Sequence, residues 1–223
     1  MTKNIASILQ SGICVSKAFP RPTPSLFYFP GLSSLPVYPA SNFPVIADVL
    51  TKNADEILKE YLNLREIGMN SDYSLISDEH TLHKGTWTWN SYILKGKVQK
   101  LFVDNCPRTV SVLESLPGIM KFTPFSYAFF STLSPNAVIS AHSGPCNLRL
   151  RCHFPIIVPK SGDFGMNIGG LTLKWNDREP IFFDDCYEHS VWNKSQEDRV
   201  VLLFDIWYLP AAFSASTTCI SCL

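Results

Sequence analysis

The clearest pattern in the chain begins near residue 85. From there, short segments rich in β-branched and aromatic residues alternate with turn residues, as is typical of β-strands. The expected strands are residues 87–94, 126–133, 137–141, 148–158, 164–168, 171–175, 181–183 and 199–209. Gly169-Gly170, between two of these segments, predicts a tight hairpin. This succession of short strands favours a double-sheet jelly roll or a small barrel.

The first third of the chain follows a different pattern. Residues 45–64 place apolar side chains at helical spacing on one face and charged side chains on the other, which predicts an amphipathic helix. Residues 109–116 predict a second, short helix that ends before Pro117-Gly118. Residues 17–45 carry seven prolines among aromatic side chains. Because those rings need cover, we expect an extended segment that lies on the domain.

Together these patterns predict a mainly β protein: a double-stranded β-helix of the jelly-roll, cupin-like type, with an N-terminal helical segment packed on it. The length of 223 residues suits one domain. The expected boundaries are a disordered or weakly ordered N-terminus over 1–16, an extended segment plus helix over 17–84, a jelly-roll core over 85–210 and a tail over 211–223.

Composition narrows the functional classes. With 46% hydrophobic residues the chain can bury a full core, and its zero net charge gives no sign of a nucleic-acid partner. Seven irregularly spaced cysteines argue against a disulfide framework, and the terminal pair Cys219 and Cys222 is expected to belong to a frayed tail. The most apolar stretch, residues 200–213, is too short to span a bilayer. We therefore expect a soluble, cytoplasmic protein.

Candidate chemistry begins with residues 148–154. Apolar and polar side chains alternate strictly there, so Arg149, Arg151 and His153 share one face of the expected strand. Two interpretations stay open. The commoner case is a half-buried strand whose polar face meets solvent. In the other case this face lines the mouth of the barrel, where two cations and an imidazole would bind an anion such as a carboxylate.

A second cluster favours the latter case. His189 follows an apolar strand, and Arg199 opens another strand ten residues later. A lone histidine in such a place is usually structural. A jelly roll, however, can bring His142 and His189 together from the ends of non-adjacent strands. Two imidazoles with open coordination positions and an inward arginine are typical of a non-haem Fe(II) oxygenase that binds a 2-oxo acid.

At this point the chain resembles a known family, the aspartyl/asparaginyl β-hydroxylases, which are Fe(II)- and 2-oxoglutarate-dependent oxygenases with a jelly-roll fold. Three motifs carry the resemblance in the family's order and spacing: HSGPCNLRLRCHFPIIVP (142–159), FFDDCYEHSVWN (182–193) and RVVLLFDIW (199–207). Weaker similarity runs through TWTWNSYILKGK (86–97) and SVLESLPG (111–118). Three motifs in register make chance agreement improbable, although each alone would be weak.

The resemblance implies roles for individual residues. His142 and His189 match the two iron ligands, and Arg199 matches the arginine that grips the carboxylate of 2-oxoglutarate. Further co-substrate contacts are implied at Arg151, His153, Ser131 and Trp89. Trp87 would take the place of Trp89 after a two-residue slip.

Gly144 stands where the usual His-x-Asp motif of these oxygenases has its carboxylate, and the resembled family also lacks it. Glycine removes a negative charge, which weakens iron binding unless neighbouring groups compensate. We expect Asp184 or Asp185 to compensate by orienting an imidazole through a hydrogen bond. We also expect an aspartate placed at position 144 to add a third ligand.

The resemblance implies an enzyme that uses Fe(II), 2-oxoglutarate and O₂ to hydroxylate the β-carbon of aspartyl or asparaginyl residues in a protein or peptide. Two alternatives stay open: the same chemistry on a free amino acid or small metabolite, and a non-catalytic jelly roll that binds a ligand. Specificity is expected in residues 17–84 and 95–110, where the resemblance is thinnest. The HxxH pair His80 and His83 is expected to lie in a solvated loop.

Overall fold

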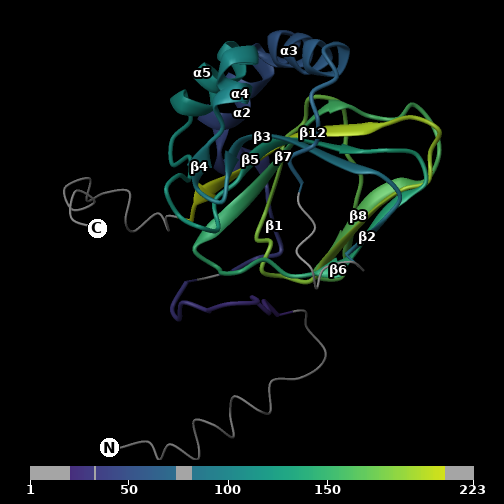
Figure 1. Cartoon of the computed structure of the whole chain (residues 1–223). Coiled ribbons are helices and arrows are strands. Elements are labelled where there is room, and N and C mark those ends of the chain that lie inside the picture. Colours follow the sequence, from purple (N-terminus) through teal and green to yellow (C-terminus); the bar gives the residue numbers. More distant parts are fainter. Residues whose placement is uncertain (1–20, 33, 74–81, 209–223) are drawn as a thin grey trace, which may run out of the picture.

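The computed structural model describes residues 21–32, 34–73 and 82–208. Two antiparallel sheets face each other, with strand orders β1-β10-β7-β12-β5-β3-β4 and β2-β6-β11-β8-β9 (Figure 1). The larger sheet comprises β1 (Val37–Tyr38), β10 (Ile181–Phe183), β7 (Arg149–Ile157), β12 (Arg199–Trp207), β5 (Ala128–Leu133), β3 (Trp87–Leu94) and β4 (Lys97–Val98). The smaller comprises β2 (His83–Lys84), β6 (Ala137–His142), β11 (His189–Asn193), β8 (Phe164–Ile168) and β9 (Leu171–Leu173). The chain crosses repeatedly between the sheets, which confirms the expected double-stranded β-helix.

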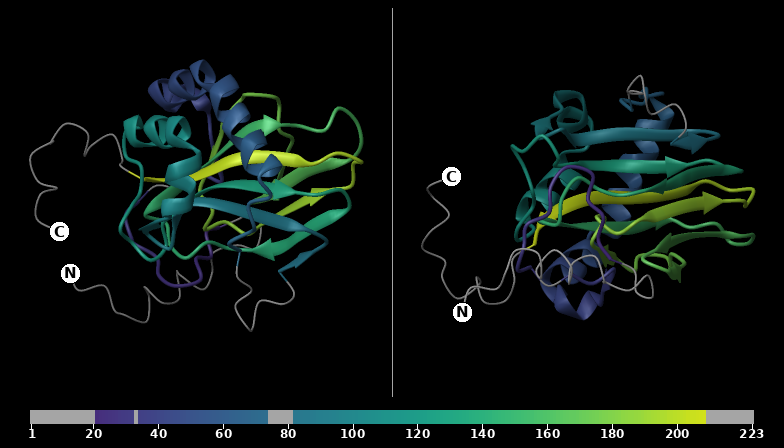
Figure 2. Two further views of the ribbon diagram at one scale, coloured as in Figure 1. Left: turned by 45° about the horizontal axis from the view of Figure 1, so that its top comes forward. Right: turned by 90° about the horizontal axis from the view of Figure 1, so that it is seen from below.

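Helices cover the outer face of the larger sheet (Figures 1 and 2). They are the short 3₁₀ helix η1 (Ala40–Asn42), α2 (Pro44–Lys52), α3 (Ala54–Glu66), α4 (Lys100–Asn105) and α5 (Pro107–Ser115). Leu50 and Ile57 from the helices join Phe130, Leu202 and Phe204 from the sheet in one core. The helical segment is therefore packed on the jelly roll, as expected. None of the helices in the described ranges is long and apolar enough to cross a membrane.

A second core lies between the two sheets, and the alternation of the strands decides which side chains enter it. On β12, Val201 and Leu203 belong to this inner core, whereas Leu202 and Phe204 belong to the outer one. This explains the unbroken apolar run of the strand, which is buried on both faces. On β7, Leu150, Cys152 and Phe154 face the helices, so the polar side chains of that strand face the space between the sheets.

The hairpin at Gly169-Gly170 is confirmed. Ile168 of β8 pairs with Leu171 of β9, so the two glycines form the whole connection. Their φ angles are +51° and +81°. A two-residue turn of this hand requires left-handed backbone at both positions, which glycine adopts without strain.

Two parts of the predicted secondary structure were wrong. The helix expected over residues 45–64 is divided at Asn53, whose side-chain amide donates to the Val49 carbonyl over 2.7 Å and whose backbone leaves the helical region. A side-chain amide that bonds to a carbonyl of the preceding turn competes with the backbone hydrogen bonds of the helix. Helix α4, strand β11 and the two-residue strands β1, β2 and β4 were not predicted. Six residues are too few to show the helical period of α4, and β11 lacks the apolar run that marked the other short strands.

The segment before β1, which we call the arm, comprises residues 21–32 and 34–36 and runs extended over the domain. The extended segment was expected over 17–45; residues 17–20 lie outside the described ranges, and η1 and α2 begin before residue 45. The Thr23 amide donates to the Cys186 carbonyl over 2.7 Å. The Asn147 side chain accepts from the Phe29 amide over 2.7 Å and donates to the Phe29 carbonyl over 2.9 Å. The arm thus bonds both to the loop that follows β6 and to the loop that precedes β11.

Candidate active site

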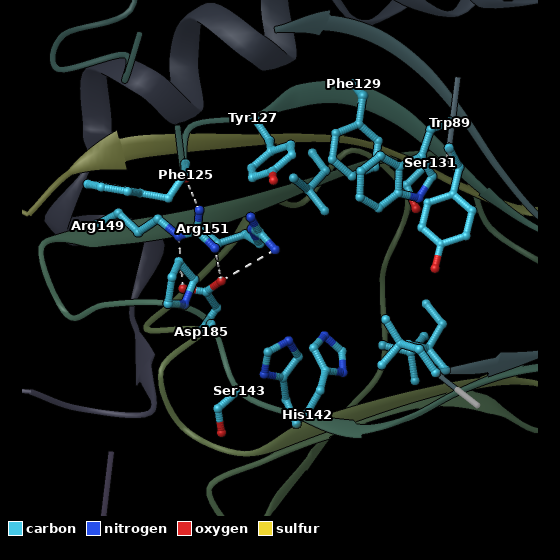
Figure 3. Close-up of a pocket in the computed structure, with 18 of the residues that line it drawn as sticks. Trp89, Phe125, Tyr127, Phe129, Ser131, His142, Ser143, Arg149, Arg151 and Asp185 are labelled. Carbon is cyan, nitrogen blue, oxygen red and sulfur yellow. Dashed lines mark hydrogen bonds and ion pairs between the residues drawn. The ribbon is translucent and has the colours of Figure 1, made fainter. Parts of the chain in front are cut away.

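A cavity of about 300 Å³ lies between the two sheets. Its lining includes every residue that the sequence singled out for iron or co-substrate: Trp89, Ser131, His142, Arg151, His153, His189 and Arg199. Figure 3 shows His142 on one wall with Tyr127 and Phe129 across the cavity; Arg149, Arg151 and Asp185 lie to one side. The polar face of β7 is therefore enclosed, and the solvated interpretation of that strand is wrong.

The two histidines meet across neighbouring strands of the smaller sheet. His142 ends β6, His189 begins β11, and the two residues are paired in the antiparallel register. Their ring centroids lie 4.1 Å apart. The strands were expected to be non-adjacent, but they are hydrogen-bonded neighbours. This register brings both imidazoles to the same edge of the cavity.

Each imidazole is oriented by a backbone carbonyl two residues earlier. His142 Nδ1 lies 2.8 Å from the Ser140 oxygen, and His189 Nδ1 lies 2.8 Å from the Tyr187 oxygen. Because a carbonyl can only accept, both Nδ1 atoms carry the proton and both Nε2 atoms carry a lone pair. Burial also lowers the pKa of His189 to about 3, so this ring is neutral at physiological pH. Neutral imidazoles with a fixed tautomer are the form that binds a metal ion.

Asp185 occupies the space beside Gly144. The Gly144 amide donates to the Asp185 carbonyl over 2.6 Å, and a Cβ added at Gly144 would lie 2.4 Å from the Asp185 carboxylate. An aspartate at position 144 therefore requires the Asp185 carboxylate to move away from its place. The expectation that such an aspartate adds a third ligand stays a prediction, and it now includes this displacement.

Neither neighbouring aspartate uses its carboxylate as expected. The Asp184 carboxylate accepts from the Ser34 hydroxyl and the Cys186 amide, over 2.5 and 3.0 Å. The Asp185 carboxylate accepts from Arg149 Nε over 3.1 Å and pairs with Arg151 at 3.3 Å. These partners are not the imidazoles that the sequence had suggested.

Asp185 belongs to an arginine–aspartate cluster made of Arg149, Arg151, Asp185 and Asp205. Arg149 Nη1 lies 3.1 Å from Asp205, and Arg151 Nε lies 2.8 Å from the same carboxylate. Burial opposes ionisation of Asp185, but the two guanidinium groups prevail and hold its pKa well below the usual range. The cluster is balanced, with two cations and two anions, so the charge of Arg151 is already compensated within the protein.

Arg199 is different, because it is a buried cation with no acidic partner in the described part of the chain. The residue is 1% exposed. Its Nη1 lies 3.3 Å from the Ser131 carbonyl, while its Nε has no hydrogen-bond partner there. Burial lowers the pKa of Arg199 to about 9, which measures how poorly the charge is solvated. A desolvated guanidinium at an open cavity is a ready site for an anion.

Trp175 links Arg199 to His153, and sequence reasoning missed it. The Arg199 guanidinium lies 4.9 Å from the centre of the Trp175 ring, a cation–π distance. The Trp175 indole N–H points to His153 Nδ1 over 3.4 Å. Burial lowers the pKa of His153, so this imidazole is neutral as well. Nothing in the local sequence around Trp175 signals this role, since the contact arises only from the packing of the two sheets.

Both tryptophans of β3 border the cavity next to Ser131. Trp89 pairs with Ser131 in the strand register, and its ring stacks on Phe129 with centroids 4.1 Å apart. The Trp87 indole N–H donates to the Ser131 hydroxyl over 2.9 Å. The Trp89 indole N–H is buried without a hydrogen-bond partner among the described residues. The indole N–H of Trp89 can therefore donate to a ligand, whereas the indole N–H of Trp87 already donates to Ser131.

The fold and this site define the class of the protein: a cupin-like jelly roll whose mouth combines two paired histidines with a buried arginine. A family model described as aspartyl/asparaginyl beta-hydroxylase matches residues 51–208. The chain belongs to this family, and the resemblance read from the three motifs is confirmed.

Similar proteins include aspartate beta-hydroxylase domain-containing protein 2 of Rattus norvegicus, 29% identical over 83% of this chain and 54% of its own length. The chain thus spans about half the length of that relative. An ornithine lipid ester-linked acyl 2-hydroxylase of Rhizobium tropici is 30% identical over 78% of this chain and 61% of its own length. Among solved structures, a Trichoplax adhaerens prolyl hydroxylase covers 80% of this chain and 95% of its own, with 12% identity and a TM-score of 0.44.

Proposed function

We propose that the protein is an Fe(II)- and 2-oxoglutarate-dependent dioxygenase that hydroxylates an unactivated C–H bond. The observation that carries this proposal is Arg199, a buried cation without an acidic partner in the described ranges, in the same cavity as two tautomerically fixed histidines. A dicarboxylate such as 2-oxoglutarate would satisfy Arg199 with one end and reach a metal with the other.

The residues present fit an iron centre. His142 and His189 would hold the metal through Nε2, because their Nδ1 protons are engaged by carbonyls. Among the described residues no group of three His, Cys, Asp or Glu side chains is placed to hold a metal. The remaining positions would fall to the co-substrate, O₂ and water. Iron with 2-oxoglutarate and O₂ would supply the oxidising chemistry; the protein binds, orients and excludes water.

The other implied residues fit supporting roles. Ser131 and Trp89 border the position of Arg199 and would contact the distal carboxylate or its chain. Arg151 and His153 lie on the same inward face of β7 and would contact the oxo-acid end. For Arg151 this contact would add to its pairs with Asp185 and Asp205, so a carboxylate would join an existing ion network.

The substrate carbon that the family implies is the β-carbon of an aspartyl or asparaginyl residue in a protein or peptide. A free amino acid or small metabolite is the first alternative substrate. A cytoplasmic location, and the expectation that the protein does not bind nucleic acid, stay predictions. A fatty acyl chain is the second candidate, because the outer part of the cavity wall is apolar at Leu26, Leu94, Pro124 and Phe125. One relative of this chain is an acyl-lipid hydroxylase by name.

We expect the purified protein to bind 2-oxoglutarate only weakly without metal and more tightly with Fe(II), because metal and Arg199 hold opposite ends. Anaerobic calorimetry measures both affinities. In air, succinate is expected to form slowly without substrate and faster with one, and mass spectrometry would detect the addition of one oxygen to a peptide or an acyl lipid. A protein that binds neither iron nor 2-oxoglutarate would refute the proposal in favour of a non-catalytic jelly roll.

We expect His189→Ala to weaken Fe(II) binding by on the order of 100-fold, since one of two protein ligands is lost. The matched control is His83→Ala. That histidine lies on β2 of the same sheet, so its expected place in a solvated loop was wrong. The centroid of its ring lies 5.8 Å from that of Trp87. Titration with Co(II), followed by its visible absorption, measures the metal affinity of the two variants and of the wild type. Equal metal affinity in His189→Ala and wild type would remove His189 from the ligand set.

A further inference from the structure

Exposed apolar side chains gather at the mouth of the cavity. We call this set the apolar rim; it comes from the arm, from β4 and from the loop over residues 121–125. Its members are Leu26, Phe27, Phe29, Val98 and Phe122. Leu26 is 72% exposed and Phe122 is 82% exposed, far more than side chains of this size usually are. Single exposed apolar residues are ordinary, whereas a group around one opening indicates an interaction site.

The rim is continuous with the cavity. Leu26, Lys95 and Phe125 line the cavity itself. The Phe27 ring packs edge-on against Phe125 with centroids 5.8 Å apart, which joins the arm to the 121–125 loop. The Phe122 amide donates over 3.2 Å to the carbonyl of Gly96, in the turn that leads to β4. A molecule that rests on the rim therefore lies directly over the entrance to the two histidines.

Phe122 is held outward by a strained backbone. Its φ is +63°, in the left-handed region that bulky L-residues rarely adopt. Glycine or asparagine would adopt this conformation with less strain. Burial within the protein cannot explain the phenylalanine, because its side chain is among the most exposed in the described structure. Strain that presents an apolar side chain to the outside is typical of a functional contact.

Four lysines lie next to rim residues along the chain: Lys95 before β4, Lys97 on β4, Lys100 at the start of α4 and Lys121 beside Phe122. Lys100 pairs with Asp104 and Lys121 with Glu114. Lys95 and Lys97 form no ion pair with any described residue. Protein–protein interfaces are depleted in lysine at their centres. Aromatic and aliphatic side chains mixed with lysines are instead typical of surfaces that dip into anionic lipid headgroups.

We propose that the apolar rim docks on an anionic lipid surface and admits an acyl chain from that surface to the cavity. The docking stands on the rim and its lysines, whereas hydroxylation of the chain rests on the proposed oxygenase function. Leu26, Phe29 and Phe122 enter the boundary between headgroups and acyl chains, while Lys95 and Lys97 contact the headgroup phosphates. The acyl chain follows the apolar wall at Leu26 and Phe125 inward.

Co-sedimentation of the full chain with vesicles tests the docking. We expect binding to vesicles of phosphatidylcholine mixed with phosphatidylglycerol, little binding to phosphatidylcholine alone, and weakening with salt. Phe122→Asn is expected to reduce the affinity about tenfold, since it removes one ring that would be buried in the lipid surface. Asparagine tolerates the left-handed backbone, so the variant keeps the fold. Lys97→Glu is expected to reduce the affinity about tenfold at low salt and less at high salt.

The matched control is Leu62→Gln, which removes a half-exposed apolar side chain from α3, in the helical layer away from the arm (Figure 1). It is expected to bind vesicles as the wild type does. Binding to neither vesicle, or equal binding by Phe122→Asn and wild type, would overturn the docking and leave a protein or peptide as the partner. Calorimetry with Fe(II) and 2-oxoglutarate on the same samples reports the oxygenase site separately, since neither Phe122 nor Lys97 lines the cavity.

Discussion

Replacing Arg199 with methionine is expected to remove 2-oxoglutarate binding and, at the same time, to make the protein more stable. Arg199 is fully buried and has no acidic partner in the described part of the chain, so the empty protein carries an uncompensated charge. Methionine has a similar length without the charge, and exchanging buried charges for apolar side chains is often stabilising. Loss of binding together with gain of stability is the signature of a residue kept for its ligand.

The expected sizes make the result easy to measure. We expect the affinity for 2-oxoglutarate to fall by about 100-fold or more, as when one partner of a buried charge pair is removed. The free energy of unfolding, from urea denaturation without ligand, should rise by about 1–2 kcal/mol. The control is Arg178→Met, an arginine that is 40% exposed and pairs with Asp55. It should change neither quantity. A destabilised Arg199→Met protein that still binds 2-oxoglutarate would contradict the role of Arg199.

Gly144→Asp is expected to destabilise the protein. The new Cβ would meet the Asp185 carboxylate at 2.4 Å, and a second carboxylate would enter a cluster that is already balanced. Overpacking together with an added buried charge predicts a loss of about 3 kcal/mol or more. Thermal unfolding followed by circular dichroism would show a midpoint lower by about 10 °C.

Two further variants test whether the contact with Asp185 causes the loss of stability in Gly144→Asp. Gly170→Asp introduces the same side chain at a glycine with no neighbouring atom within 4 Å, so it should cost only about 1 kcal/mol for the backbone. The double variant Gly144→Asp with Asp185→Gly exchanges the positions of carboxylate and glycine, and it should be more stable than either single variant. If Gly144→Asp unfolds at the wild-type temperature, the Asp185 carboxylate does not pack against Gly144.

The sequence predicted the fold well where a regular pattern continued for a whole strand. β3, β7 and β12 were found almost at their observed limits, because their alternation or unbroken apolar run reflects burial on one face or two. The break at Asn53 and the short helix α4 escaped, since a single side-chain bond or six residues leave no periodic signal.

The candidate site was predicted as a set of residues but not as an arrangement. Every expected iron or co-substrate residue lines one cavity. The partners were not foreseen, because Asp185 and Asp205 bond to Arg149 and Arg151 only once β7, β12 and the loop after β10 have packed together. One signal was present: Asp205 interrupts the apolar run of a strand buried on both faces, and such a charge requires a buried partner.

The two histidines and the arginine belong to different sheets. His142 and His189 lie on the smaller sheet, while Arg199 and His153 lie on the larger. A ligand held at one end by the metal and at the other by Arg199 would therefore bridge the gap between the sheets. The distance between the sheets, which is set by apolar inner-core residues such as Leu203, would then determine which length of dicarboxylate fits. Selection among oxo acids of different length would lie in the packing of the sandwich as much as in any residue that touches the ligand.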